Sequence, residues 1–217
     1  MVKASLSDLN LFKIVDESAK DVHLGGSQEW YRTEHQRRSG CGPCTAAVLV
    51  SYMVRSREPL EERKKILSKK EFVSLMEKMW NYVTPSDRGL PSTDLFYKYL
   101  LSYAKDNGLL VSRCAICDMH SPSSRPSLSH VISFIEEALK KDLPVAFLNL
   151  DSGEEDRLDE WHWAVITAIE HDAGHAFVDV IDGGSLLRVN LRLWYETTKL
   201  GGGFVFFELK NQSKRRP

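Results

Sequence analysis

Cys41 stands in a segment whose residue types could make a cysteine nucleophilic. From Gln36 the chain reads Gln-Arg-Arg-Ser-Gly-Cys-Gly-Pro-Cys-Thr-Ala-Ala, and the apolar run after Pro43 predicts a helix over about 43–54. Cys41 is then expected at the N-terminus of this helix. Unpaired backbone N–H groups and the positive end of the helix dipole favour a thiolate there, and the thiolate is the reactive form of cysteine.

A base and a group to orient it follow much later in the chain. His162 begins the apolar run His-Trp-Ala-Val-Ile-Thr-Ala-Ile, and Asp182 ends the next apolar run, just before Gly183-Gly184. Both runs predict strands, and adjacent antiparallel strands with a short connection place the start of one beside the end of the other. Cys41, His162 and Asp182 are therefore expected to act as nucleophile, general base and orienting carboxylate.

The same cysteines could serve two other chemistries. Cys41-Gly-Pro-Cys44 has the spacing of a thiol–disulfide redox motif, although the preceding segment is polar rather than a buried strand. A zinc site would need Cys114 and Cys117 as well, but side chains three residues apart in a strand point to opposite faces. Nucleophilic catalysis is the favoured chemistry, with thiol–disulfide exchange by Cys41 and Cys44 as an alternative.

The rest of the chain predicts helices first and strands later. The polar, basic residues 30–39 predict a loop. Apolar residues at helical spacing predict further helices over 72–80, 93–106 and 128–141, with a short strand at 109–117 among them. From residue 143 the pattern changes, and strands are expected at 144–150, 161–169, 176–181, 186–190 and 203–209. Helices followed by strands without alternation predict an α+β fold.

Length and composition indicate one domain. The 217 residues are 42% hydrophobic and carry a formal net charge of −1, enough for a substantial core and without an electrostatic case for nucleic-acid binding. No signal peptide or membrane span is evident, so a cytoplasmic protein with reduced cysteines is expected. An N-terminal segment without a predicted structure is expected at 1–29, one domain at 30–210 and a frayed basic tail at 211–217. Within the domain, the helical part is expected at about 41–142 and the sheet part at about 143–210.

These segments resemble the papain-like cysteine peptidases, and among them the bacterial families similar to the double-glycine leader peptidases that process bacteriocins. The resemblance spans about residues 30–209 and is carried by Gln36, Ser39-Gly-Cys-Gly-Pro, His162-Trp-Ala-Val-Ile and Val180-Ile-Asp-Gly-Gly. It implies a helical lobe packed against an antiparallel sheet lobe, with the active site in the cleft between them. It also implies that Cys41 is the nucleophile, His162 the base, Asp182 the orienter and Gln36 an oxyanion donor beside the Cys41 amide.

The expected function is cleavage of a peptide or other amide bond through a thioester on Cys41. The expected partner is a peptide or amide substrate, without a metal or organic cofactor, nucleic acid or membrane. An acyl or peptidyl transferase similar to phytochelatin synthase is an alternative, because water and another nucleophile attack the same thioester. A thiol oxidoreductase and a binding module with vestigial catalytic groups are the other classes that the sequence leaves open.

An acidic loop precedes His162. Residues 151–160 carry six acids against one arginine, a pattern typical of a solvated connection. The alternative interpretation is that the loop rims the cleft, where its negative field would attract cationic peptides or amines. In that case neutral replacements of Glu154, Glu155 and Asp156 are expected to weaken the capture of basic substrates.

Overall fold

The computed structural model describes residues 1–86, 89–119 and 125–210. Over these residues the chain forms seven α-helices, two short 3₁₀ helices and two sheets, in which all strand pairs but one are antiparallel. The predicted α+β class is therefore confirmed. The basic tail expected at 211–217 lies outside the described residues.

The helices expected at 43–54, 72–80, 93–106 and 128–141 are confirmed, and three more are present in the described residues. The loop expected at 30–39 is wrong for its second half, because Thr33 and Gln36 form a capping box that starts a helix. A further helix begins after Asn190, whose side chain accepts a hydrogen bond from the Leu193 backbone amide. The helices are α1 (Glu34–Ser39), α2 (Cys41–Arg55), α3 (Leu60–Arg63), α4 (Lys69–Trp80), α5 (Thr93–Asp106), α6 (Leu128–Lys140) and α7 (Leu191–Thr197), with 3₁₀ turns at Leu9–Phe12 and Gln28–Trp30.

The strands expected after residue 143 are also confirmed. The strands are β1 (Val2–Ser5), β2 (Lys13–Asp16), β3 (Asp21–Leu24), β4 (Leu67–Ser68), β5 (Val111–Asp118), β6 (Val145–Asn149), β7 (His162–His171), β8 (Ala176–Asp182), β9 (Ser185–Asn190) and β10 (Gly202–Leu209). The large sheet has the order β5-β10-β6-β7-β8-β9, and the small sheet has the order β3-β2-β4.

Two strands from the first part of the chain complete the large sheet. β5 lies within the expected helical part, 41–142, and pairs with β10 along its whole length. β1, from the N-terminal segment, pairs with β7, where Ala4 lies opposite Ile169. The sheet is thus assembled from distant segments, and residues 1–29 are part of the folded unit.

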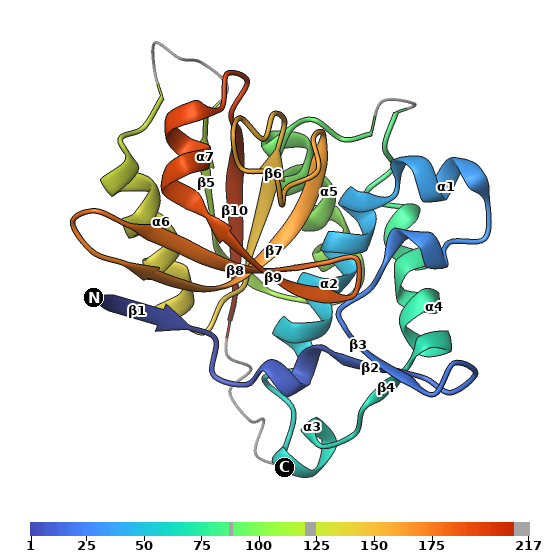
Figure 1. Cartoon of the computed structure of the whole chain (residues 1–217). Helices are drawn as coiled ribbons and strands as arrows, with labels where there is room; N and C mark the ends of the chain where they lie inside the picture. Colours follow the sequence, from blue (N-terminus) through green and yellow to red (C-terminus); the bar gives the residue numbers. More distant parts are fainter. Residues whose placement is uncertain (87–88, 120–124, 211–217) are drawn as a thin grey trace.

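Figure 1 shows the large sheet between two helical layers, with α2 and α5 on one face and α6 and α7 on the other. Alternating side chains of β10 supply both faces, as the two-residue period of a strand requires. Phe207 stacks on Tyr97 of α5, with ring centroids 6.0 Å apart. Phe206 contacts Phe134 of α6 at 5.0 Å on the opposite face. Apolar residues therefore pack on both sides of the sheet.

Helix α2 is the most buried helix and lies between β7 and α4. Every residue of α2 except Val54 is buried. The Thr45 hydroxyl donates a hydrogen bond to the Trp163 carbonyl oxygen at 3.1 Å, which ties the first turn of α2 to the start of β7. Cys41 and His162, which begin these two elements, are thus held by packed secondary structure rather than by free loops.

Candidate active site

Cys41 is the first residue of α2, and 6% of its surface is exposed. Gly40 occupies the N-cap position and provides no side-chain cap. The backbone N–H groups of Cys41 and Gly42 have no acceptor within the helix, because the first turn of an α-helix leaves its amides unpaired. These donors and the positive end of a 15-residue helix favour negative charge at the thiol.

The backbone of Trp161 is unusual and contacts the thiol directly. Its φ of 54° lies in the left-handed region, which bulky residues rarely adopt. The Trp161 carbonyl oxygen accepts a hydrogen bond from Cys41 Sγ at 3.9 Å. Strained backbone of this kind is concentrated at functional sites. The residue that precedes His162 therefore connects β7 to the cysteine.

The structure brings His162 and Asp182 together at the ends of neighbouring strands, as the strand order predicts. His162 Nε2 lies 2.7 Å from Asp182 Oδ1, and the two side chains are 16% and 20% exposed. Gly183 and Gly184, with φ of 54° and 85°, make the two-residue hairpin that ends β8 at Asp182. Because Nε2 faces Asp182, Nδ1 is the ring nitrogen left for the thiol.

The electrostatics of His162 favour the imidazolium form. Burial by itself lowers the pKa of the ring, but hydrogen bonds to Asp182 and to Cys41, together with their charges, outweigh burial and raise this pKa to about 10. At neutral pH the ring is therefore protonated when the thiolate is present. A protonated imidazole in the same cavity as a cysteine is suited to give a proton to a leaving group.

The other three cysteines are poorly placed for thiolate chemistry. Burial raises the pKa of Cys44 far above its ordinary value. Burial also raises the pKa of Cys114 to about 12 and that of Cys117 to about 11. All four cysteines are free, and among the described residues they do not converge on a common metal position.

One group of side chains within the described part of the chain could hold a metal ion. Ligand atoms of Asp159, His162 and Asp182 lie within 4.8 Å of one another. Two of these groups already share the 2.7 Å hydrogen bond, so a metal ion bound by all three would have to replace it. Without a metal ion, the same three side chains form a histidine, His162, that is held by the carboxylate of Asp182, with the carboxylate of Asp159 nearby.

The Gln36 side chain bonds to Thr33 and Glu77 rather than to the thiol of Cys41. Its Oε1 accepts hydrogen bonds from the Thr33 backbone amide at 3.1 Å and the Thr33 hydroxyl at 3.0 Å. Its Nε2 donates to Glu77 Oε2 at 2.7 Å. The amide thus starts α1 and ties it to α4. The observed side-chain orientation does not provide the expected oxyanion contact, whereas the first turn of α2 offers the Cys41 and Gly42 amides.

A cavity lies beside Cys41 and His162, and the N-terminal segment forms one of its walls. The Leu24 amide donates to the Gly184 carbonyl oxygen at 2.8 Å, which fixes the end of β3 against the turn after Asp182. Gln28 and Glu29 follow β3 and line the same cavity as Asp159. Sequence reasoning missed these three residues, and only the acidic loop around Asp159 gave a signal.

Two acids of the loop 151–160, Asp151 and Glu155, form hydrogen bonds that hold the fold together. Asp151 accepts hydrogen bonds from the backbone amide of Gly153 in its own loop at 2.9 Å and from that of Lys199, between α7 and β10, at 2.7 Å. Glu155 is only 1% exposed and bonds to Arg157 and to the Asn190 amide. Glu155 is therefore engaged within the fold, and the expected role of the loop in substrate capture stays a prediction. Of the loop's acids, only Asp159 lines the cavity.

Comparison with known proteins adds no assignment. Neither a protein-family model nor a curated protein sequence matches the chain. In the described part of the chain, no helix has the length and apolar character that crossing a membrane requires.

Proposed function

We propose that the protein is a cysteine hydrolase that cleaves a peptide or amide bond, with a papain-like arrangement of its nucleophile and base. The observation that carries this proposal is the convergence of three side chains. Cys41 begins a buried helix and lines one cavity together with His162 and Asp182, and Asp182 Oδ1 lies 2.7 Å from His162 Nε2. Cys41 lies on α2, His162 on β7 and Asp182 on β8, and α2 packs against β7, which pairs with β8.

The reaction proceeds through a thioester. The Cys41 thiolate attacks the carbonyl carbon, and the oxyanion that forms accepts hydrogen bonds from the Cys41 and Gly42 amides. The carbon–nitrogen bond breaks as the His162 imidazolium gives its proton to the leaving amine. Neutral His162 then takes a proton from water, and the hydroxide attacks the thioester carbon. The acid leaves, and the Cys41 thiolate and the imidazolium are restored.

The geometry supports acyl transfer better than thiol–disulfide exchange. An exchange site requires two thiols, and Cys44 does lie one turn from Cys41. A hydrogen-bonded His–Asp pair beside the first thiol has no part in that chemistry, whereas it is the base that a thioester mechanism requires. The segment before the cysteines is helix α1 rather than a buried strand. Transfer to an amine in place of water would use the same residues and the same thioester.

The test is a substrate-independent acylation assay with p-nitrophenyl acetate. The proposal predicts a burst of p-nitrophenol of one equivalent per protein, an acetyl group on Cys41 in mass spectra, and slow release of acetate. Cys41→Ala should abolish the burst, and His162→Ala should slow both formation and loss of the thioester. Cys44→Ser should retain the burst, because thioester chemistry needs one thiol. Acetylation elsewhere in the chain, or a burst that requires Cys44, contradicts the proposal.

A further inference from the structure

Cys44 is a second cysteine in the active-site cavity, and the thioester mechanism does not use it. It lies one turn after Cys41 in α2, and both side chains line the cavity that also contains His162. Each of the two cysteines is 6% exposed. Cys41-Gly-Pro-Cys44 has the spacing of a thiol–disulfide redox motif. The fold thus keeps a second thiol close to the nucleophile.

The first turn of α2 holds the two cysteines at a separation that a disulfide can span. The Cys44 amide donates to the Gly40 carbonyl oxygen at 2.9 Å, so this turn is regular α-helix. Residues three apart in an α-helix share a face, and their Cα atoms are about 5 Å apart, within the range of about 4.4–6.8 Å found in disulfides. The Cβ atoms must approach by about 1–2 Å, and Gly42 between the cysteines tolerates such a backbone change. Cys41 and Cys44 can therefore be joined without unfolding α2.

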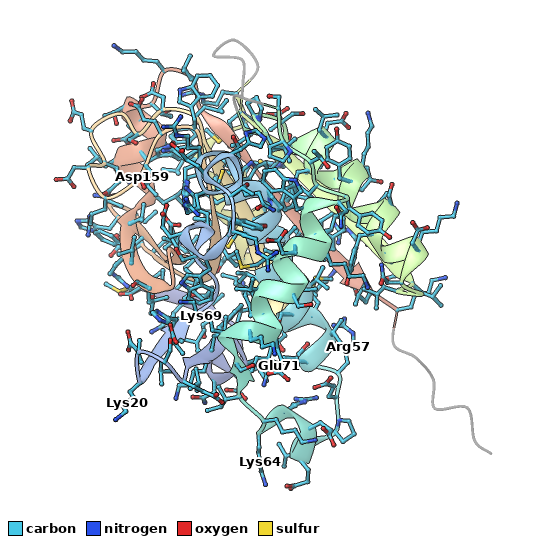
Figure 2. All side chains as sticks on the ribbon, turned by 90° about the vertical axis from the view of Figure 1, so that its right-hand side faces the viewer. Lys20, Arg57, Lys64, Lys69, Glu71 and Asp159 are labelled. Carbon is cyan, nitrogen blue, oxygen red and sulfur yellow. The ribbon has the colours of Figure 1, made fainter. Side chains whose placement is uncertain are left out.

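The cavity has room for a small oxidant. Its volume is about 200 Å³, against roughly 15 Å³ for one water molecule. Asp159, which is exposed, lines the cavity and marks its solvent side, in the upper half of Figure 2. Hydrogen peroxide is little larger than water, so it fits beside the Cys41 thiol.

We propose that a peroxide oxidises Cys41 and that Cys44 then closes a reversible Cys41–Cys44 disulfide, which switches the hydrolase off and protects its nucleophile. The disulfide does not depend on the proposed function, whereas its effect on activity rests on that function. A sulfur held in a disulfide cannot attack a carbonyl carbon, because the thiolate is the nucleophile. Without a second thiol, a sulfenic acid is oxidised further to sulfinic and sulfonic acids, which thiols do not reduce.

The oxidation has two steps. The Cys41 thiolate attacks one oxygen of hydrogen peroxide, the oxygen–oxygen bond breaks, and the hydroxide that leaves takes up a proton and becomes water. Cys41 is then a sulfenic acid. The Cys44 sulfur attacks the Cys41 sulfur, the sulfur–oxygen bond breaks, and the leaving hydroxide becomes water with the proton of Cys44. In total the two sulfurs give up two electrons, and hydrogen peroxide is reduced to two molecules of water.

The surroundings of the two sulfurs set this order. Cys41 lies at the N-terminus of α2 and in the same cavity as the His162 imidazolium, and both favour its thiolate. Burial raises the pKa of Cys44 far above its ordinary value, so Cys44 stays a thiol and reacts poorly with peroxide itself. Cys41 is therefore the sulfur that is oxidised first, and Cys44 is the sulfur that resolves the sulfenic acid.

Cys114 and Cys117 provide an internal control, because Cys114-Ala-Ile-Cys117 has the same spacing in the sequence. They lie on strand β5. Three residues of a strand span about 10 Å, and the side chains at its two ends point to opposite faces. Cysteines with Cα atoms more than about 7 Å apart cannot be bridged without backbone movement. Cys114 and Cys117 should therefore remain thiols under conditions that join Cys41 to Cys44.

The test is oxidation by a small excess of hydrogen peroxide, followed by denaturation, blocking of free thiols with iodoacetamide and peptide mass spectrometry. Cys41 and Cys44 fall in one tryptic peptide, 39–55, which should lose two hydrogens in the wild type and regain both thiols with dithiothreitol. In Cys44→Ser and Cys44→Ala, Cys41 should instead become a sulfinic or sulfonic acid that dithiothreitol does not reverse. Cys44→Ala is included because it leaves no unpaired hydroxyl at this buried position, and circular dichroism checks that each variant is folded.

The p-nitrophenol burst measures the effect on activity. Oxidation should remove the burst completely, and dithiothreitol should restore it in the wild type and in the control variant Cys114→Ser but not in either Cys44 variant. Oxidation of wild-type Cys41 to a sulfinic or sulfonic acid while Cys44 stays a thiol overturns the proposal, as does equal recovery with and without Cys44. A protein without a burst before oxidation contradicts the proposed hydrolase, whereas the mass of peptide 39–55 still decides whether the disulfide forms.

Discussion

Asp182→Asn tests how the carboxylate acts on His162. The change removes one negative charge and keeps an oxygen that can accept from Nε2, so the 2.7 Å contact can persist. Hydrogen bonds to charged groups contribute about 1.5–3 kcal/mol, against about 0.5–1.5 kcal/mol for neutral ones. The difference of about 1–2 kcal/mol corresponds to roughly one pKa unit. Because Asp182 raises the pKa of His162, the substitution should lower it from about 10 to roughly 9.

The assay for this prediction is an NMR titration of the imidazole Cε1–H group, with His162→Gln used to identify the signal among the seven histidines. Asp182→Ala should have a larger effect, because it removes both the charge and the acceptor and leaves a buried ring nitrogen unpaired. The acylation rate should follow the same order, wild type above Asn above Ala. A His162 pKa that is the same in wild type and Asp182→Ala would refute the reasoning, since it would show that the carboxylate does not act on the ring.

Three further predictions concern stability and the role of Gln36. Gln36→Ala removes the capping box and the bond to Glu77, so it should lower the free energy of unfolding by about 1–2 kcal/mol. The acylation rate should change only a few-fold. An acylation rate about 100-fold lower at unchanged stability would instead support an oxyanion role for Gln36. Glu155→Gln should lower the free energy of unfolding in urea by about 1–3 kcal/mol, because the buried charged partner of Arg157 is lost. Glu154→Gln is the control, and equal urea midpoints for the two variants would contradict this prediction. The free energy of unfolding of wild type should exceed that of His162→Gln most below pH 6.5, and this difference should decline as pH rises toward about 10. The reason is that the His162 ring keeps its proton in the folded state but loses it near pH 6.5 in the unfolded state. A difference that grows with pH would contradict the raised pKa of His162.

The parts of the fold that depend on local pattern could be predicted from the sequence. The helix at Cys41, the strand at His162 and the turn after Asp182 each follow from neighbouring residues, namely an apolar run after Pro43, a β-rich apolar run and a Gly-Gly pair. Strand order then follows from the short connection between β7 and β8. The proximity of His162 and Asp182 was therefore accessible before the structure.

The parts that depend on distant pairing could not be predicted in the same way. The pairing of β1 with β7 joins Ala4 to Ile169, and no local pattern encodes that contact. The cavity wall at Gln28 and Glu29 follows from a hydrogen bond between Leu24 and the turn after β8. Helix α1, in contrast, had a readable signal, since Thr33 and Gln36 have the capping-box spacing. That signal also explains why the Gln36 amide is engaged away from the thiol.

The central claim is that His162 activates Cys41, and residue-resolved alkylation by iodoacetamide at pH 7 tests it most directly. Burial raises the pKa of Cys117 to about 11, which leaves roughly 10⁻⁴ of it as thiolate at this pH, and Cys114 still less. The account predicts that Cys41 is labelled first and that His162→Ala slows its labelling about tenfold or more, because the imidazolium that stabilises the thiolate is lost. Labelling that falls mainly on Cys44, or that is equally fast in His162→Ala, would contradict the assignment.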